Sequence, residues 1–299
     1  MGEEKKMEED ISRQERINRR RKKRARKNMF DILTTAVIVV ALGIFLFSGY
    51  KLLSTWREYN AGTKQYDELV ALFPTLPETE AQETKAAETT DSPSGESEEV
   101  TASEETTAPA EDPRDWVAFY QEMKALNPDY VGWIIIEGTQ INYPIVQSSD
   151  NDYYLHRLFD GTENFSGTLF VDYRCEDNFV SGNTIVHGHN MKNGSMFAGL
   201  LKYREEWFYN SHKTFSVYTE EGEIVYEVFA IYATDPVSTS YVVDFSSDEE
   251  YVDWMNAMYA QSVVKPAVNL NADTQVLTLS TCVNNSENRL IIQARRVTP

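Results

Sequence analysis

Apolar runs, several of them alternating with polar residues, dominate the chain beyond residue 113 and predict eight β-strands. The expected strands are Val131–Glu137, Gln140–Ile145, Thr168–Val171, Asn183–His187, Thr214–Thr219, Ile224–Ala233, Gln275–Thr281 and Arg289–Arg296. The segments 137–139 and 220–223 each contain a glycine and predict tight turns between neighbouring strands. Eight strands interrupted only by short helices make the chain mostly β and favour a closed antiparallel barrel over a doubly wound sheet.

Helical spacing of apolar residues predicts three short helices in the same region. Asp112-Pro113 reads as an N-cap and first helical position, and Asn127-Pro128 would end that helix. A second helix is expected after Ser195, and a third at Ser247–Gln261, which opens with a capping box. We therefore expect one folded domain at 113–299, whose roughly 190 residues are ample for a single core.

One apolar run near the N-terminus follows a different pattern. Residues 32–50 form 19 consecutive positions without a charge, enough for a helix to cross a hydrocarbon core of about 30 Å. A cleaved signal peptide is the alternative, but its apolar region usually has about 7–15 residues and a small-residue cleavage site. Here the run leads into Tyr50 and Trp56, which suit a membrane interface. We expect an uncleaved transmembrane anchor at 29–50.

Charge is distributed very unevenly about this anchor. The chain has 28 basic and 47 acidic residues; residues 1–28 hold 12 and 6 of them, which leaves 16 and 41 for the rest. The positive-inside rule then predicts a basic cytoplasmic tail at 1–28 and an extracellular location for everything after residue 50. A nucleic-acid patch is the alternative for such a basic cluster. The adjacent apolar run instead indicates that the cluster sets the orientation of the anchor in the membrane, and we expect no nucleic-acid partner.

Two segments connect the anchor to the domain. Residues 51–74 place aromatic and apolar side chains at helical spacing and predict a helical stalk. Residues 75–112 contain twelve Asp or Glu, one lysine and no aromatic residue. Such a segment cannot bury enough apolar surface to fold, so we expect a disordered acidic linker with a span of roughly 35 Å or more. It would hold the domain away from the membrane.

The strand that ends at Cys282 carries the first candidate chemistry, because Arg289 follows it by seven residues at the start of the next strand. A free thiol has a pKa of about 8.5, so a cysteine nucleophile needs an activating partner. Arginine keeps its charge and can stabilise an oxyanion, although an ordinary solvated role is the alternative and Arg295 is a fallback. A disulfide between Cys175 and Cys282 would block this chemistry, so we expect two free thiols, with Cys175 structural.

Histidine is the natural partner for a thiol, and the chain has four. His156 and His212 look like ordinary surface or loop residues. His187 and His189 stand where an apolar strand runs into a glycine-containing turn, a place where a strand can present functional groups. A metal site and a purely structural pair are the alternatives. A metal would need a third ligand, and neither cysteine has metal-type spacing, so we expect no metal.

At these residues the chain resembles the sortase family. The run 278–282, Thr-Leu-Ser-Thr-Cys, matches the family's TLxTC signature, and Arg289 matches its catalytic arginine. Gly188-His189-Asn190 matches the element that carries the catalytic histidine, while His187 stands where a different residue, often tyrosine, is expected. Class B sortases are further indicated by the segments 127–133, 141–147, 191–197 and 247–261. The resemblance covers about residues 114–297, although the cysteine-to-arginine interval is short for the family.

The resemblance implies an eight-stranded sortase barrel and a cysteine transpeptidase without a cofactor. Cys282 would attack the threonine carbonyl of a C-terminal sorting signal in a secreted protein, and Arg289 would stabilise the oxyanion. His189 would protonate the departing amine and then deprotonate the amino group of a peptidoglycan precursor. Ser280 and Thr281 would contact the substrate. The alternatives are a pilin-polymerising sortase with a lysine acceptor and a non-catalytic, membrane-tethered binding domain.

Overall fold

The computed structural model describes residues 2–74, 116–176, 179–283 and 287–297. The expected linker at 75–112 and the expected N-cap at Asp112-Pro113 lie outside these ranges. The chain divides into two compact units, Met1–Asn60 and Ala61–Pro299.

A single helix, α1 (Gly2–Leu72), contains the N-terminal apolar run. The chain has no proline before Pro74, so nothing in the sequence removes a backbone N–H from this helix, and Pro74 disfavours its continuation. The side chains of residues 31–50 are exposed, and the run is long and apolar enough to cross a membrane. Length and composition therefore permit α1 to serve as an anchor.

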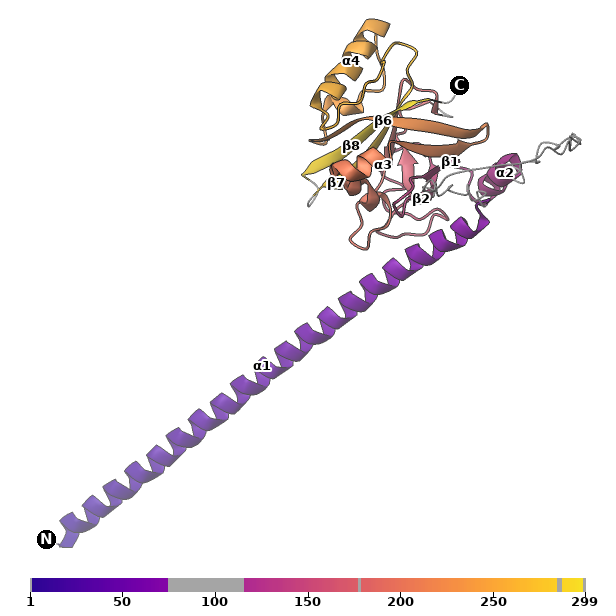
Figure 1. Cartoon of the computed structure of the whole chain (residues 1–299). Coiled ribbons are helices and arrows are strands. Elements are labelled where there is room, and N and C mark those ends of the chain that lie inside the picture. Colours follow the sequence, from indigo (N-terminus) through magenta and orange to yellow (C-terminus); the bar gives the residue numbers. More distant parts are fainter. Residues whose placement is uncertain (1, 75–115, 177–178, 284–286, 298–299) are drawn as a thin grey trace, which may run out of the picture. The chain divides into compact units, whose positions relative to one another are not determined.

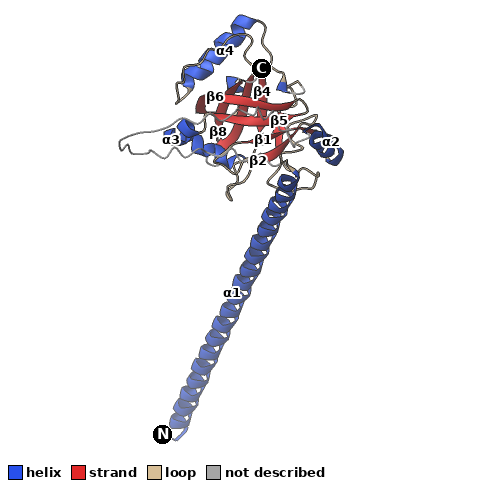
Figure 2. Ribbon diagram, turned by 45° about the vertical axis from the view of Figure 1, so that its right-hand side comes forward, coloured by secondary structure: helices blue, strands red, loops and turns tan. Residues whose placement is uncertain are grey.

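The eight expected strands are present and close into a barrel (Figure 2). They are β1 (Tyr130–Ile135), β2 (Asn142–Val146), β3 (Leu169–Val171), β4 (Asn183–His187), β5 (Thr214–Thr219), β6 (Gly222–Thr234), β7 (Val276–Val283) and β8 (Asn288–Arg296). Their order around the barrel is β1-β2-β3-β4-β7-β8-β6-β5, with β5 pairing back to β1. The expected closed barrel is therefore confirmed.

The expectation that all strands are antiparallel was wrong. β2 pairs with β3, and β4 with β7, in parallel. A parallel pair needs a connection long enough to bring the chain back to the same end of the sheet. The segment 147–168 provides this between β2 and β3, while β5, β6 and the helix α4 (Asp248–Gln261) lie between β4 and β7 in the chain.

The helices differ from expectation mainly at their ends. The first is α2 (Trp116–Leu126), and the helix expected after Ser195 is a 3-10 helix, η2 (Phe197–Arg204), followed by α3 (Glu206–Ser211). Met196 cannot join η2 because its φ of 54° is left-handed. Ser247 caps α4 by accepting a hydrogen bond from the Glu250 N–H at 3.2 Å. The Glu250 carboxylate, however, accepts from the N–H of Ser246, one residue earlier than in a capping box.

One face of the sheet formed by β6, β7 and β8 is covered by α4 (Figure 1). Val276 of β7 and Ile291 of β8 are buried in the same cluster as the α4 residue Met255. Side chains alternate along a strand, so Ser280 and Cys282 share the face of Val276. The cysteine therefore lies on the face that α4 partly covers.

A buried polar network holds the segment 239–242 beside this face of the sheet. The Asn183 Oδ1 atom accepts from the Thr278 hydroxyl at 2.6 Å, and Gln293 Nε2 donates to that hydroxyl at 3.1 Å. The Asn183 amide donates to the carbonyls of Ser240 and Val242, at 3.2 and 2.8 Å. Because an unpaired buried amide is costly, these contacts fix the short helix η3 (Thr239–Tyr241) against β4 and β7.

Phe73, the residue after α1, lies among four aromatic rings of the second unit. Its ring centroid is 5.2 Å from that of Trp116, 5.4 Å from Phe119, 5.0 Å from Trp133 and 5.3 Å from Tyr218. Offset and edge-to-face rings at such distances add to the stabilisation from burial. The C-terminal end of α1 is therefore part of the folded unit that contains the barrel.

We expect Phe73→Ala to lower the free energy of unfolding by roughly 3 kcal/mol, as is usual when a buried phenylalanine is truncated. Leu72→Ala is the matched control, since Leu72 is 43% exposed and its truncation should change stability by less than about 0.5 kcal/mol. Urea unfolding of the full chain in detergent, followed by tryptophan fluorescence, measures both. Equal effects would mean that the aromatic cluster does not secure this end of the helix.

Candidate active site

Strand register brings the three expected catalytic residues together. In the parallel pair β4–β7, His187 lies opposite Ser280, so His189 and Cys282, each two residues further on, lie at the same end of this strand pair. In the antiparallel pair β7–β8, Cys282 lies directly opposite Arg289. Directly opposed residues share one face at short range. Cys282 is therefore flanked by the histidine loop on one side and by the arginine on the other.

These residues line a cavity of about 700 Å³. Its walls come from β3 and β4, from the segment 236–242 and from the adjacent ends of β7 and β8. All five residues expected from the sequence line it: His189, Ser280, Thr281, Cys282 and Arg289. A cavity of this size suits a short stretch of an extended peptide or a small molecule.

The ring of His189 is fixed by a backbone contact. Its Nε2 atom lies 2.8 Å from the carbonyl oxygen of Leu155. A carbonyl can only accept, so Nε2 carries the proton in this contact, and Nδ1 is left to exchange a proton with a substrate. Burial lowers the pKa of His189, the Leu155 carbonyl opposes that effect, and the positive charges of His156 and Arg289 lower the pKa further.

The loop that carries His189 is attached to the cysteine strand by three hydrogen bonds. The Asn190 amide donates to the Cys282 carbonyl at 2.9 Å, and the Gly188 N–H donates to the Ser280 carbonyl at 3.1 Å. The Thr281 hydroxyl donates to the Gly188 carbonyl at 2.8 Å. Thr281 is only 1% exposed, so this contact supports a role in holding the histidine loop rather than in binding a peptide. A side chain at Gly188 would overlap Leu169 and Phe197.

His187 forms part of the cavity wall. Its Nε2 atom lies 3.2 Å from the Asp172 carboxylate, and its ring stacks between Phe170 and Tyr241. The Arg174 guanidinium donates to both oxygens of Asp172 at 2.8 Å. Burial alone would raise the pKa of Asp172, but hydrogen bonds from Arg174 and His187 outweigh it and hold the pKa well below its usual range. Asp172 therefore stays ionised and orients the side chains of both Arg174 and His187.

The remaining sequence candidates have other partners. Arg295, the fallback for Arg289, donates to the Glu227 carboxylate of β6 at 2.6 and 3.0 Å. Both cysteines are free, and burial raises the pKa of the Cys175 thiol to about 11. Cys175 therefore stays protonated and fills space beside Ile185. Its sulfur accepts a hydrogen bond from the Ile185 N–H at 3.4 Å. Within the described ranges, no group of three or more His, Cys, Asp or Glu side chains is arranged to hold a metal ion.

Asp172, Arg174 and Tyr241 are among the cavity residues that the sequence analysis did not single out. The Tyr241 hydroxyl lies 2.8 Å from that of Ser280 and ties the segment 236–242 to the cysteine strand. For Asp172 and Arg174 a signal existed, because two charged residues fall within the three positions after the apolar strand β3. Tyr241 had no such signal, since it lies in η3, a single short 3-10 turn that no apolar periodicity marks.

Comparison with known proteins agrees with this geometry. Residues 134–297 match the family model described as "Sortase domain". Sortase B of Listeria monocytogenes is 33% identical over 271 residues, which are 90% of this chain and 98% of that protein. Crystal structures of sortase B from B. anthracis and Clostridium perfringens superpose with TM-scores of 0.56 and 0.57, at 39% and 34% identity. Each covers 60% of this chain, and the superposition covers 85% and 99% of theirs. The chain therefore belongs to the sortase family and is a class B sortase, a cysteine transpeptidase.

Proposed function

We propose that this sortase cleaves a C-terminal sorting signal of secreted proteins after a threonine and transfers the protein to an amine of a peptidoglycan precursor. The catalytic residues would be Cys282, His189 and Arg289. The observation that carries the proposal is that these three residues surround one cavity, with Cys282 between the other two. A solved structure of Staphylococcus aureus sortase B, 29% identical, is a complex with its substrate, which supports a substrate-binding role for this fold.

In the first half of the reaction, the Cys282 thiolate attacks the threonine carbonyl and forms a C–S bond. The negative charge passes to the carbonyl oxygen, where the Arg289 guanidinium, directly across the strand pair, donates hydrogen bonds to it. The C–N bond then breaks, and His189 gives the departing nitrogen a proton, so that the sorting signal leaves as an amine. The product is a thioester on Cys282.

In the second half, an amino group of the acceptor attacks the thioester. His189, now neutral, removes a proton from that amine, and the Cys282 thiolate leaves as the new C–N bond forms. The thioester conserves the free energy of the original peptide bond, so the exchange requires no ATP. Lowering of the His189 pKa by burial favours the neutral imidazole that this half needs.

The remaining cavity walls would select the peptide. Ser280 and Tyr241 join their hydroxyls on one side, and Asp172 holds His187 and Arg174 on another. Hydrogen-bonding groups that are fixed in this way discriminate well, because a wrong substrate leaves them unpaired. We assign substrate contacts to the pair of Ser280 and Tyr241, because Ser280 shares the face of Cys282 and the pair borders the cavity. We assign a supporting role to Thr281.

The location follows from the charge pattern and from the apolar run. The basic residues before the run would stay in the cytoplasm, α1 would span the membrane once, and the unit with the barrel would lie outside the cell. In that location Cys282 would have access to secreted proteins and to cell-wall precursors.

The test is to trap the acyl intermediate. We expect the full chain in detergent, mixed with a panel of threonine-containing sorting peptides, to gain the mass of the N-terminal peptide fragment on Cys282. Adding amines, including short cell-wall-type peptides and a lysine peptide, should release that fragment as an amide of the acceptor. A fragment attached to another residue would overturn the site. Preferential transfer to lysine would replace the cell-wall acceptor by a pilin-like one.

A further inference from the structure

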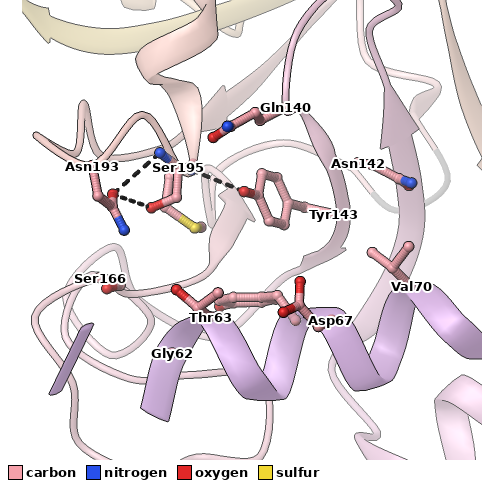
Figure 3. Close-up of a pocket in the computed structure, with 12 residues that line it drawn as sticks. Gly62, Thr63, Asp67, Val70, Gln140, Asn142, Tyr143, Ser166, Asn193 and Ser195 are labelled. Carbon is pink, nitrogen blue, oxygen red and sulfur yellow. Dashed lines mark hydrogen bonds between the residues drawn. The ribbon is translucent and has the colours of Figure 1, made fainter. Parts of the chain in front are cut away.

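The last turns of α1 lie against the barrel close to the histidine loop. Tyr66 and Leu69 of α1, with Phe73 just beyond it, are buried, and their spacing puts them on one side of a helix. This segment belongs to the same compact unit as the barrel. Beside it lies a second cavity, of about 450 Å³, between α1, β2 and the residues 193–196 (Figure 3).

A first route connects Tyr66 to His189 through this cavity. The rings of Tyr66 and Tyr143 meet edge to face with centroids 5.2 Å apart. The Tyr143 hydroxyl accepts a hydrogen bond from the Met196 N–H at 3.3 Å, the dashed line that reaches Tyr143 in Figure 3. The residue after Met196 closes the loop, because the Phe197 N–H donates to the His189 carbonyl at 2.8 Å.

Met196 makes this support necessary. Its φ of 54° is unfavourable for a residue with a side chain, and such conformations persist only where neighbours hold them. Its side chain is fully buried, and its backbone pairs with that of Asn190. The Tyr143 hydroxyl is thus one of the groups that keep the far end of the histidine loop in place.

A second route starts at the Tyr66 hydroxyl. It donates to the Gly167 carbonyl at 2.6 Å and lies 3.0 Å from the Thr168 hydroxyl. The Thr168 N–H in turn donates to the carbonyl of Tyr154 at 2.9 Å. The next carbonyl in the chain, that of Leu155, accepts from Nε2 of His189. The two routes therefore reach the histidine from opposite sides, one through its backbone and one through its ring.

We propose that Tyr66 is a positioning residue for His189, acting through Tyr143 on its loop and through Gly167 and Thr168 on the carbonyl that orients its ring. The proposal rests on the catalytic role assigned to His189 above. Proton transfer requires hydrogen-bond distance between the imidazole and the reacting nitrogen, so small displacements of the ring slow it.

The test compares Tyr66→Phe with Tyr143→Phe in the full chain in detergent. Tyr66→Phe keeps the ring contact and removes the hydroxyl contacts, whereas Tyr143→Phe removes only the acceptor of the Met196 N–H. We expect each change to lower kcat for peptide cleavage about tenfold, with KM and the melting temperature nearly unchanged. Lys64→Gln is the matched control, because Lys64 is exposed on the same helix and its ion pair with Glu68 lies at the surface. The activity of this variant should equal that of the wild type.

A pH profile separates positioning from a general loss of structure. Burial and the nearby His156 and Arg289 lower the pKa of His189. The Leu155 carbonyl raises that pKa, so weakening its contact with Nε2 in Tyr66→Phe should move the kinetic limb set by His189 to lower pH. Histidine NMR titration of the same variant reports the shift without relying on turnover.

Each possible result decides a separate point. An unchanged kcat and an unchanged titration of His189 in folded Tyr66→Phe overturn the positioning role. A loss of activity that only follows a lower melting temperature, with the titration unchanged, overturns it as well. If the wild type forms no acyl intermediate on Cys282, the proposed function fails, whereas the NMR titration still tests the contact of Tyr66 with the histidine.

Discussion

A Cys282→Ala variant is expected to lose peptide cleavage by a factor of about a thousand or more while remaining folded, because it removes the atom that bonds to the substrate. Cys282 is near the end of β7 and only partly buried, so the lost sulfur leaves little packing to repair. The mass assay for the acyl intermediate should give no adduct. Circular dichroism and thermal unfolding should match the wild type.

Cys175→Ser is the matched control, because it changes the only other thiol in the chain. Cys175 accepts from the Ile185 N–H and donates to the Asn183 carbonyl, and a serine hydroxyl can do both. We expect this variant to keep its activity within about twofold, since it alters no cavity group. Cleavage that survives in Cys282→Ala, or that disappears in Cys175→Ser at unchanged stability, would contradict the assignment of the nucleophile.

Local patterns were sufficient to predict the strands but not their pairing. Asn183–His187 and Thr214–Thr219 were predicted to the residue, because each apolar run is bounded by turn or loop residues. The parallel pairing of β4 with β7 could not be predicted, since an apolar run reads the same for either direction of its partner. Yet this pairing is what puts His189 next to Cys282.

In the candidate site, too, some residues can be predicted from local patterns and others cannot. Cys282, His189 and Arg289 could be found because their residue types and short motifs carry chemistry by themselves. The groups that orient them are backbone atoms or distant side chains, such as the Leu155 carbonyl and Tyr66. Contacts of this kind depend on the closed fold, so no local pattern announces them.

Replacing His189 by alanine should lower the rate of acyl transfer by about a hundred- to ten-thousandfold, the range usual for a general acid and base. Unlike Cys282→Ala, this variant keeps the thiol, so a slow acyl adduct should still accumulate on Cys282. Rapid-quench kinetics with mass detection measures formation and transfer separately, and we expect both to slow, since the leaving amine and the attacking amine each exchange a proton with the ring.

The wild-type pH profile provides the second measurement of this role. Because burial and nearby positive charge lower the pKa of His189, the limb that it sets should lie below the ordinary histidine value of about 6.5. His156→Gln is the matched control: His156 is exposed, its ring centroid is 6.4 Å from that of His189, and it lines no wall of the active-site cavity. Its loss should leave the maximal rate unchanged and move the limb slightly upward, because one neighbouring positive charge is removed. A His189→Ala enzyme with wild-type rates at every pH would exclude this histidine from the mechanism.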